Sequence, residues 1–282
     1  MVTLIKKLIL SFVFGTINLH SFSQNLITAT FNIRLQNSGD SGNLWSQRAP
    51  YVAALIRFHA FDIFGTQEGF RNQLNDIIKT LPDYDFYGAG RDDGKEAGEH
   101  SAIFFRKDRF ILLKKGDFWL SETPDQPSKG WDATCCNRIC SWVQVTDKKT
   151  GKNFYFFSAH FDHQGKVARV ESSKLILQRI NTIAGNEPVI FAGDLNGDQQ
   201  SEWYRNIDSS ELFGDTFKQV EFPYAGNGTF NAFGENMEAT GIIDHIFVTK
   251  HFIVKRWGIL SDSYHGKYPS DHFPVMAEVE IK

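Results

Sequence analysis

Short apolar runs rich in β-branched and aromatic residues recur along the chain, and most are bounded by Gly, Asp or Asn. Runs of this length and composition are typical of β-strands. The segment KKTGK, residues 148–152, separates two of them and predicts a hairpin turn. The sequence therefore predicts strands at residues 26–33, 61–67, 101–106, 138–146, 153–160, 188–193, 242–249 and 273–281.

Other segments carry apolar residues at the three- and four-residue spacing that forms one face of an α-helix. They predict helices at residues 48–58, 70–81 and 167–184. Because a hairpin joins some strands and helices join others, a purely parallel, doubly wound sheet is not expected. An α/β fold, in which mixed sheets pack face to face with helices on the outside, fits this order of elements.

The N-terminus has the three regions of a secretory signal peptide. Lys6 and Lys7 precede an apolar run, and small polar residues lead to a cleavage site after Ser23. A buried first strand or helix is the alternative, but the strand at 26–33 already begins the mature domain, and the apolar run is too short for a membrane span. The sequence thus predicts a signal peptide at 1–23 and one domain at 24–282, in a periplasmic or secreted protein without stable membrane insertion.

The cysteines are Cys135, Cys136 and Cys140, and an exported location would permit one local disulfide. Adjacent cysteines rarely bridge, so Cys140 is expected to pair with Cys135 or Cys136, unless all are inert thiols. A zinc site is not expected here, because no histidine is near in the sequence and the spacing is wrong.

Composition and charge limit which partners the protein is expected to have. The chain of 282 residues is 41% hydrophobic and 22% charged, which excludes a disordered or fibrous protein. Its formal net charge is −3, whereas a non-specific nucleic-acid binder usually carries a basic face. Nucleic acid is therefore an alternative partner and not the favoured one, although a local basic groove is compatible with this total. A monomer is expected.

Polar side chains with acid, amide or imidazole groups lie where the predicted strands begin or end. Each would be a common turn or cap by itself, but so many are hard to explain by turns alone. Loops beyond strand ends form the usual ligand crevice of α/β sheets, and we expect these residues to meet there: Asn32, Glu68, His160, Asp194, Asn196, Asp244, Asp271 and His272.

These groups suit hydrolysis at phosphorus. Oxygen ligands such as those of Glu68, Asp271 and Asn32 are typical of Mg²⁺ or Mn²⁺ sites, and such a cation stabilises charge on a phosphoryl group. Imidazoles can donate to the same oxygens or transfer protons near neutral pH. Asp194 could orient or deprotonate a water, and Asn196 could hold it. No GxSxG or cysteine–histidine pattern accompanies them, so covalent acyl transfer is not favoured.

Several short motifs of the chain occur in a known order. They are TFNIR, GTQEG, SAHFDH, GDLN, IDHIFV and SDHFPV. In this order they resemble the endonuclease/exonuclease/phosphatase superfamily, which includes deoxyribonuclease I, apurinic endonucleases, inositol polyphosphate 5-phosphatases, bacterial sphingomyelinases and deadenylases. The resemblance covers the mature chain from Thr30 to near the C-terminus. It implies a four-layer sandwich of two mixed β-sheets flanked by helices, in an exported bacterial-type enzyme.

The resemblance also implies roles for individual residues. Glu68 is similar to the central metal ligand of the family, with Asn32 and Asp271 close to the metal. His272 resembles the catalytic histidine, oriented by Asp244, and His160 the histidine that contacts phosphate. Glu99 matches an acid that pairs with His160, which would fix the ring tautomer and raise the pKa of His160. Asp194 and Asn196 match the pair that orients water and binds the transition state.

Basic residues near these motifs are candidates for substrate contacts. Arg34 stands where some nucleases of the family carry an acid, and it either faces a substrate phosphate or forms a surface salt bridge. Arg138 and Arg169 could also contact an anionic substrate. Asp162 and His163 follow His160 closely and are expected to support it. His245 is expected to point away from the site, because side chains alternate along a strand.

The leading hypothesis is a metal-dependent phosphoester hydrolase, either a phosphodiesterase or a phosphatase, acting outside the cytoplasm. A secreted DNA or RNA nuclease is the first alternative and would need a basic groove. A sphingomyelinase-like phospholipid hydrolase is the second and would need an exposed apolar hairpin. A binding module without turnover is disfavoured, because the whole metal and histidine set is present.

Overall fold

The computed structural model describes residues 25–282, so the predicted signal peptide at 1–23 lies outside the described residues. Two mixed sheets of six strands each form the centre of this part of the chain. The first sheet has the order β11-β12-β1-β2-β4-β3, with bounds β1 Leu26–Asn32, β2 Ile63–Gln67, β3 Tyr84–Tyr87, β4 Ile103–Arg106, β11 Phe252–Ile259 and β12 Val275–Ile281.

The second sheet has the order β5-β6-β7-β8-β10-β9. Its middle strands pair in parallel, β7 with β8, and β8 pairs antiparallel with β10. The bounds are β5 Phe110–Trp119, β6 Ile139–Asp147, β7 Asn153–His160, β8 Val189–Asp194, β9 Gly214–Asp215 and β10 Asp244–Val248.

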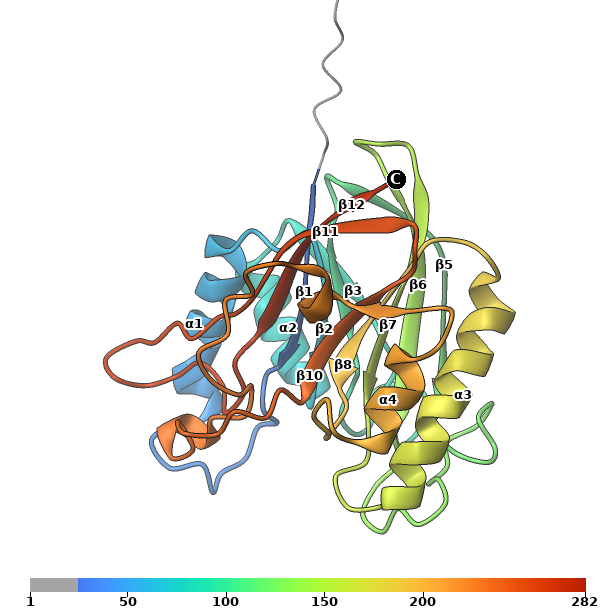
Figure 1. Cartoon of the computed structure of the whole chain (residues 1–282). Coiled ribbons are helices and arrows are strands. Elements are labelled where there is room, and N and C mark those ends of the chain that lie inside the picture. The colour runs from blue at the N-terminus through green and yellow to red at the C-terminus, as the bar shows by residue number, and fades with distance from the viewer. Residues whose placement is uncertain (1–24) are drawn as a thin grey trace, which may run out of the picture.

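Helices cover the outer face of each sheet, which gives four layers (Figure 1). Helices α1 (Trp45–Phe58) and α2 (Arg71–Thr80) lie on the first sheet, and α3 (Lys166–Ala184) and α4 (Glu202–Asp208) lie on the second. Separate apolar clusters fill the space between the sheets and beneath each helical layer. The predicted four-layer α/β sandwich is therefore confirmed. No helix within residues 25–282 combines the length and the apolarity needed to cross a bilayer.

Every strand and helix that the hydrophobic pattern predicts has a counterpart, and residues 148–152 form the turn between β6 and β7. The strands that the pattern missed, β3, β5, β9 and β11, all lie at sheet edges. An edge strand pairs on one side only and is often protected by charged residues, so its apolar run is interrupted. In β5, for example, Lys114 and Lys115 are exposed and break the pattern.

The prediction that Cys140 forms the disulfide with Cys135 or Cys136 is wrong. The disulfide joins the neighbours Cys135 and Cys136, while Cys140 is free and buried on β6. Cys140 packs in the apolar layer beneath α3 and is thereby kept away from the loop that holds the other two. No histidine is near the cysteines in the sequence, but the fold places His163 beside them.

Candidate active site

The register of the central strands brings the predicted site residues to one end of both sheets. In the first sheet β1 and β2 are parallel, and the last residue of β1, Asn32, lies beside the residue that precedes Glu68. In the second sheet His160 at the end of β7 lies opposite Asp194 at the end of β8. Asp194 also pairs with Asp244, the first residue of antiparallel β10. Five side chains from distant parts of the chain therefore meet at the same end of the two sheets.

Asn32 joins the two sheets through its side chain. Its Nδ2 donates to Glu68 Oε1 and to Asp194 Oδ2, at 3.0 Å in both cases. Its Oδ1 accepts the backbone N–H of Arg34 at 3.1 Å, and the residue is fully buried. The amide thus fixes one carboxylate of each sheet relative to the other, and it stands behind the cavity wall.

Three residues at this end of the sheets have a left-handed backbone conformation. Arg34, Glu68 and Asn196 have φ angles of 56°, 67° and 47°, in the left-handed region that residues other than glycine seldom occupy. Such conformations cost about 1–3 kcal/mol each and cluster at functional sites. Each of these residues directly follows, or lies two residues beyond, the end of a central strand, and the strain turns its side chain into the site.

His272 and Asp244 form a buried pair. His272 Nδ1 donates to Asp244 Oδ2 at 2.9 Å, and Asp244 is held by its backbone N–H, which donates to Thr229 Oγ1. Burial lowers the pKa of His272, but Asp244, Asp194 and Asp271 together raise it well above its ordinary value. The ring is therefore protonated at neutral pH and can donate through Nε2.

Asp194 and Asn196 share a tight turn. The backbone N–H of Asn196 donates to Asp194 Oδ1 at 2.8 Å, and Asn196 Nδ2 donates to His160 Nε2 at 3.2 Å and to the carbonyl of Phe161 at 3.0 Å. Asp194 Oδ2 lies 3.5 Å from His160 Nε2 and 3.8 Å from His272 Nε2. One carboxylate oxygen therefore lies between both imidazoles.

The pKa of His160 is lowered in the structure, whereas the pairing with Glu99 was expected to raise it. Glu99 Oε2 is 4.0 Å from His160 Nδ1, beyond a direct hydrogen bond, and it pairs instead with Arg91 Nη1 at 2.5 Å. Burial, then Arg138 and Arg91, lower the pKa of His160 well below its ordinary value. The ring is neutral, because two guanidinium groups and the loss of solvent outweigh the distant carboxylate.

A cavity of about 450 Å³ opens at this end of the sheets. Three predicted site residues are absent from its wall: Asn32 and Asp244 stand behind it, and Arg169 donates to the carbonyl of Asp162 and covers the ring of Trp203. The predicted residues that line the cavity are Arg34, Glu68, Glu99, Arg138, His160, Asp194, Asn196, Asp271 and His272.

Arg34 forms a salt bridge, which is one of the two predicted alternatives, and it also lines the cavity. It forms a two-point pair with Asp40 at 3.0 Å, and its Nη1 lies 3.7 Å from Asp271 Oδ2 on the cavity wall. Arg91 and Phe230 also line the cavity and were not predicted. Arg91 lies in a glycine-rich segment that lacks the spacing of a phosphate-binding loop. Phe230, whose ring meets that of His272 edge-on, lies in a loop that carries no sequence motif.

The acidic half of the cavity fits a hard divalent cation. Burial is the main cause that raises the pKa of Asp271, and Glu68 raises it further. The pKa of Asp194 rises to about 7, through burial and the nearby Asp244. Buried carboxylates whose ionised form is disfavoured are stabilised by a bound cation. Glu68 and Asp271 line the cavity and could hold it, while Asn32 stands behind them and positions Glu68. Asp194, Asp244 and His272 form a separate compact group of possible ligands.

His245 points away from the cavity but reaches the turn that carries Asn196. Its Nε2 donates to the carbonyl of Gly197 at 2.9 Å. Its Nδ1 lies 3.7 Å from Asp215 Oδ2, which also accepts from the hydroxyl of Tyr204 at 2.8 Å. These side chains are buried, so they fix the position of the turn from behind.

Replacement of His245 by Leu should therefore lower kcat about tenfold at nearly unchanged KM, as is common when a partner behind a site is lost. His245→Gln, which keeps an N–H donor, should recover much of the rate. Steady-state kinetics and thermal melting of both variants check this. Equal loss of kcat in the two variants, at the melting temperature of the unaltered protein, would contradict a role for the hydrogen bond to Gly197.

Comparison with known proteins supports the geometry. Residues 29–272 match the Endonuclease/Exonuclease/phosphatase family. A crystal structure of a family protein from Bacteroides thetaiotaomicron is 48% identical, with a TM-score of 0.89 over 92% of this chain and 98% of that one. A mannosyl-6-phosphatase of the same species is 49% identical, with a TM-score of 0.87 over 90% of this chain and 99% of its own.

A curated relative is an uncharacterized protein of Acanthamoeba polyphaga mimivirus, 29% identical over 181 residues. The match covers 54% of this chain and 26% of that protein, so the chain spans about a quarter of the length of this relative.

Proposed function

The chain belongs to the endonuclease/exonuclease/phosphatase family and is a phosphoester hydrolase. We propose that it is a divalent-metal-dependent phosphatase that acts on a phosphorylated sugar outside the cytoplasm. The cavity carries this proposal. It combines the hard oxygen ligands of Glu68 and Asp271 with the imidazoles of His160 and His272 in one open cavity. A volume of about 450 Å³ is that of a small-molecule site.

The charge of the cavity favours a monoester over a diester. Arg34, Arg91 and Arg138 line it together with Glu68, Glu99, Asp194 and Asp271, and His272 is held protonated by the surrounding carboxylates. A divalent cation bound to these carboxylates would leave the cavity with an excess of positive charge. A phosphomonoester carries close to two negative charges at neutral pH, as a phosphorylated side chain does, whereas a diester carries one. The additional charge is best compensated where several guanidinium groups converge. The similarity to a mannosyl-6-phosphatase supports a sugar as the rest of the substrate.

The side chains divide the reaction between them. A divalent cation, when bound, neutralises a phosphoryl oxygen and stabilises the charge of the transition state. Asp194 and Asn196 orient the attacking water, because one carboxylate oxygen and one amide converge from a single rigid turn. The protonated His272, aligned by Asp244, donates to a phosphoryl oxygen. The neutral His160 accepts the N–H of Asn196 at Nε2 and so holds that amide beside Asp194.

An extracytoplasmic location is supported by the signal-peptide pattern at residues 1–23 and by the disulfide between Cys135 and Cys136, since disulfides persist in oxidising compartments. N-terminal sequencing of the protein recovered from outside the cytoplasm should begin at Gln24.

A substrate panel tests the activity. In Mg²⁺ or Mn²⁺ the protein should hydrolyse mannose 6-phosphate or another hexose phosphate at least about a hundredfold faster than a diester such as bis(4-nitrophenyl) phosphate, measured as kcat/KM. EDTA should abolish release of phosphate, and added Mg²⁺ should restore it. Faster nicking of plasmid DNA or cleavage of sphingomyelin would favour a nuclease or a phospholipid hydrolase. Turnover that is unaffected by EDTA would contradict the metal dependence.

A further inference from the structure

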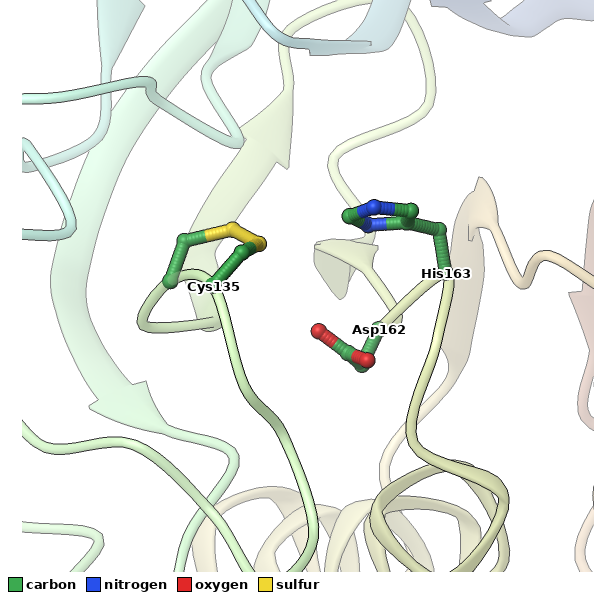
Figure 2. Close-up of side chains that lie close together, drawn as sticks. Cys135, Asp162 and His163 are labelled. Carbon is green, nitrogen blue, oxygen red and sulfur yellow. A yellow bond between two sulfur atoms is a disulfide. The ribbon is translucent and has the colours of Figure 1, made fainter.

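A second group of metal-binding side chains lies beside the cavity, on two loops that are far apart in the sequence. The loop between β5 and β6 carries Cys135 and Cys136, and the turn after β7 carries Asp162 and His163. Both sulfurs, a carboxylate oxygen and an imidazole nitrogen lie within 4.8 Å of one another. Figure 2 shows the carboxylate and the imidazole facing the disulfide across a gap.

A contact outside this group ties the first loop to the segment after the turn, and backbone N–H groups of the turn fix the carboxylate within the group. Asp132, three residues before the disulfide, accepts the backbone N–H groups of Val167 and Ala168 at the start of α3, at 3.0 and 2.7 Å. Asp162 Oδ1 accepts the N–H groups of Gln164 and Gly165 at 2.8 and 2.6 Å. The carboxylate is therefore fixed by one oxygen and presents the other to the gap. Such preorganisation favours binding, because little ordering remains for a ligand to induce.

Asp162 and His163 already bind a positive charge, the guanidinium of Arg138. Arg138 donates from Nη2 to His163 Nδ1 at 2.8 Å, and its Nε lies 3.4 Å from Asp162 Oδ2. A cation bound to the imidazole and the carboxylate would compete with this guanidinium for both groups. Cys135 and His163 are exposed and Cys136 is half-buried, so solvent species can enter the gap.

The oxidation state of the sulfurs decides whether the gap can hold a metal. A disulfide offers no thiolate, and the thiolate is the form in which cysteine binds a metal. Reduction by two equivalents of a thiol breaks the S–S bond, transfers two electrons to it and leaves two thiols and one external disulfide. On binding a divalent cation, both thiols release their protons to solvent. The ligand set is then two thiolates, one imidazole and one carboxylate.

We propose that Cys135, Cys136, Asp162 and His163 form a redox-gated site for a thiophilic divalent cation such as Zn²⁺, separate from the hard-cation site of the catalytic centre. Two soft sulfurs and an imidazole favour Zn²⁺ or Cd²⁺, whereas Mg²⁺ requires oxygen ligands. Cys136 and His163 line the catalytic cavity, as Arg138 does, so the site lies at the wall of that cavity.

Cadmium titration of the full-length mature protein tests this site, with excess Mg²⁺ to occupy the hard-cation site. After reduction and removal of the reductant, Cd²⁺ should produce the ultraviolet charge-transfer absorption of cadmium thiolate, saturating at one equivalent per chain. The oxidised protein should produce no such absorption. Absence of the absorption in the reduced protein would overturn the proposal.

Variants separate this site from the remaining thiol. Cys140→Ser removes the buried free cysteine and should leave the titration unchanged, whereas Cys135→Ser combined with Cys136→Ser should abolish the absorption. His163→Ala should weaken Cd²⁺ binding by about tenfold or more, at least the effect of losing a residue behind a metal ligand. Equal affinity in His163→Ala and the unaltered reduced protein would show that the thiols bind Cd²⁺ without the site described.

Discussion

Replacement of Glu68 by Gln is expected to lower kcat/KM about a thousandfold. The cation contributes several kcal/mol of transition-state stabilisation, and each 1.4 kcal/mol, roughly, is a factor of ten in rate. The amide of Gln keeps nearly the same shape but removes the charge that faces Asp271 and Arg34 across the cavity. Its oxygen can still accept from Asn32, as Glu68 does at 3.0 Å, and the variant loses only the bond that Leu35 N–H donates to Oε2 at 3.1 Å, so the fold should persist.

Two measurements distinguish this result from general damage. Calorimetric titration with Mn²⁺ should show that Glu68→Gln binds the cation much more weakly, and thermal melting should show a folded protein. Glu211→Gln, at an exposed position outside the cavity, is the matched control and should keep full activity. A Glu68→Gln variant that retained both Mn²⁺ affinity and turnover would remove this residue from the metal site.

Replacement of His272 by Ala should lower kcat about a thousandfold, within the range of general acid–base catalysis. The pKa of His272 is held well above its ordinary value by Asp244, Asp194 and Asp271 against the effect of burial. Activity that needs the protonated ring should therefore be full at neutral pH and fall as the pH rises through this pKa. In His272→Ala the residual activity should lose this alkaline decline.

The pH–rate profile from neutral to alkaline pH checks the assignment. His265→Asn, an exchange at an exposed position outside the cavity, should keep both the rate and the profile. An alkaline decline that persisted unchanged in His272→Ala would assign the titration to another group. A small effect on kcat would exclude His272 as the proton donor.

The central strands could be predicted because their cause is local. A strand that is covered on both faces needs an almost continuous apolar run, and runs such as residues 153–160 and 188–193 have this composition. The edge strands β3, β5, β9 and β11 carry no such run, because one side of each is unpaired and more polar residues are tolerated.

Most members of the candidate site were predictable, although Arg91 and Phe230 were missed, but the electrostatics of the site were not. Polar residues at strand ends are visible in the sequence, and the parallel pairing of β7 with β8 brings His160 beside Asp194. The pKa of His160 could not be inferred from the sequence, because Arg91 and Arg138 come from other loops and Glu99 pairs with Arg91. A pKa depends on every charge within a few ångströms and on burial, and neither quantity is encoded locally.

By itself, the sequence determined the layered fold and the residue types at one end of it, since hydrophobic periodicity and strand termini are properties of short segments. Only the tertiary structure decided which of these groups touch. It placed the amide of Asn32 between Glu68 and Asp194, and it brought His163 to the disulfide of Cys135 and Cys136. These contacts join residues from different loops and both sheets, and their geometry is set by packing of the whole chain.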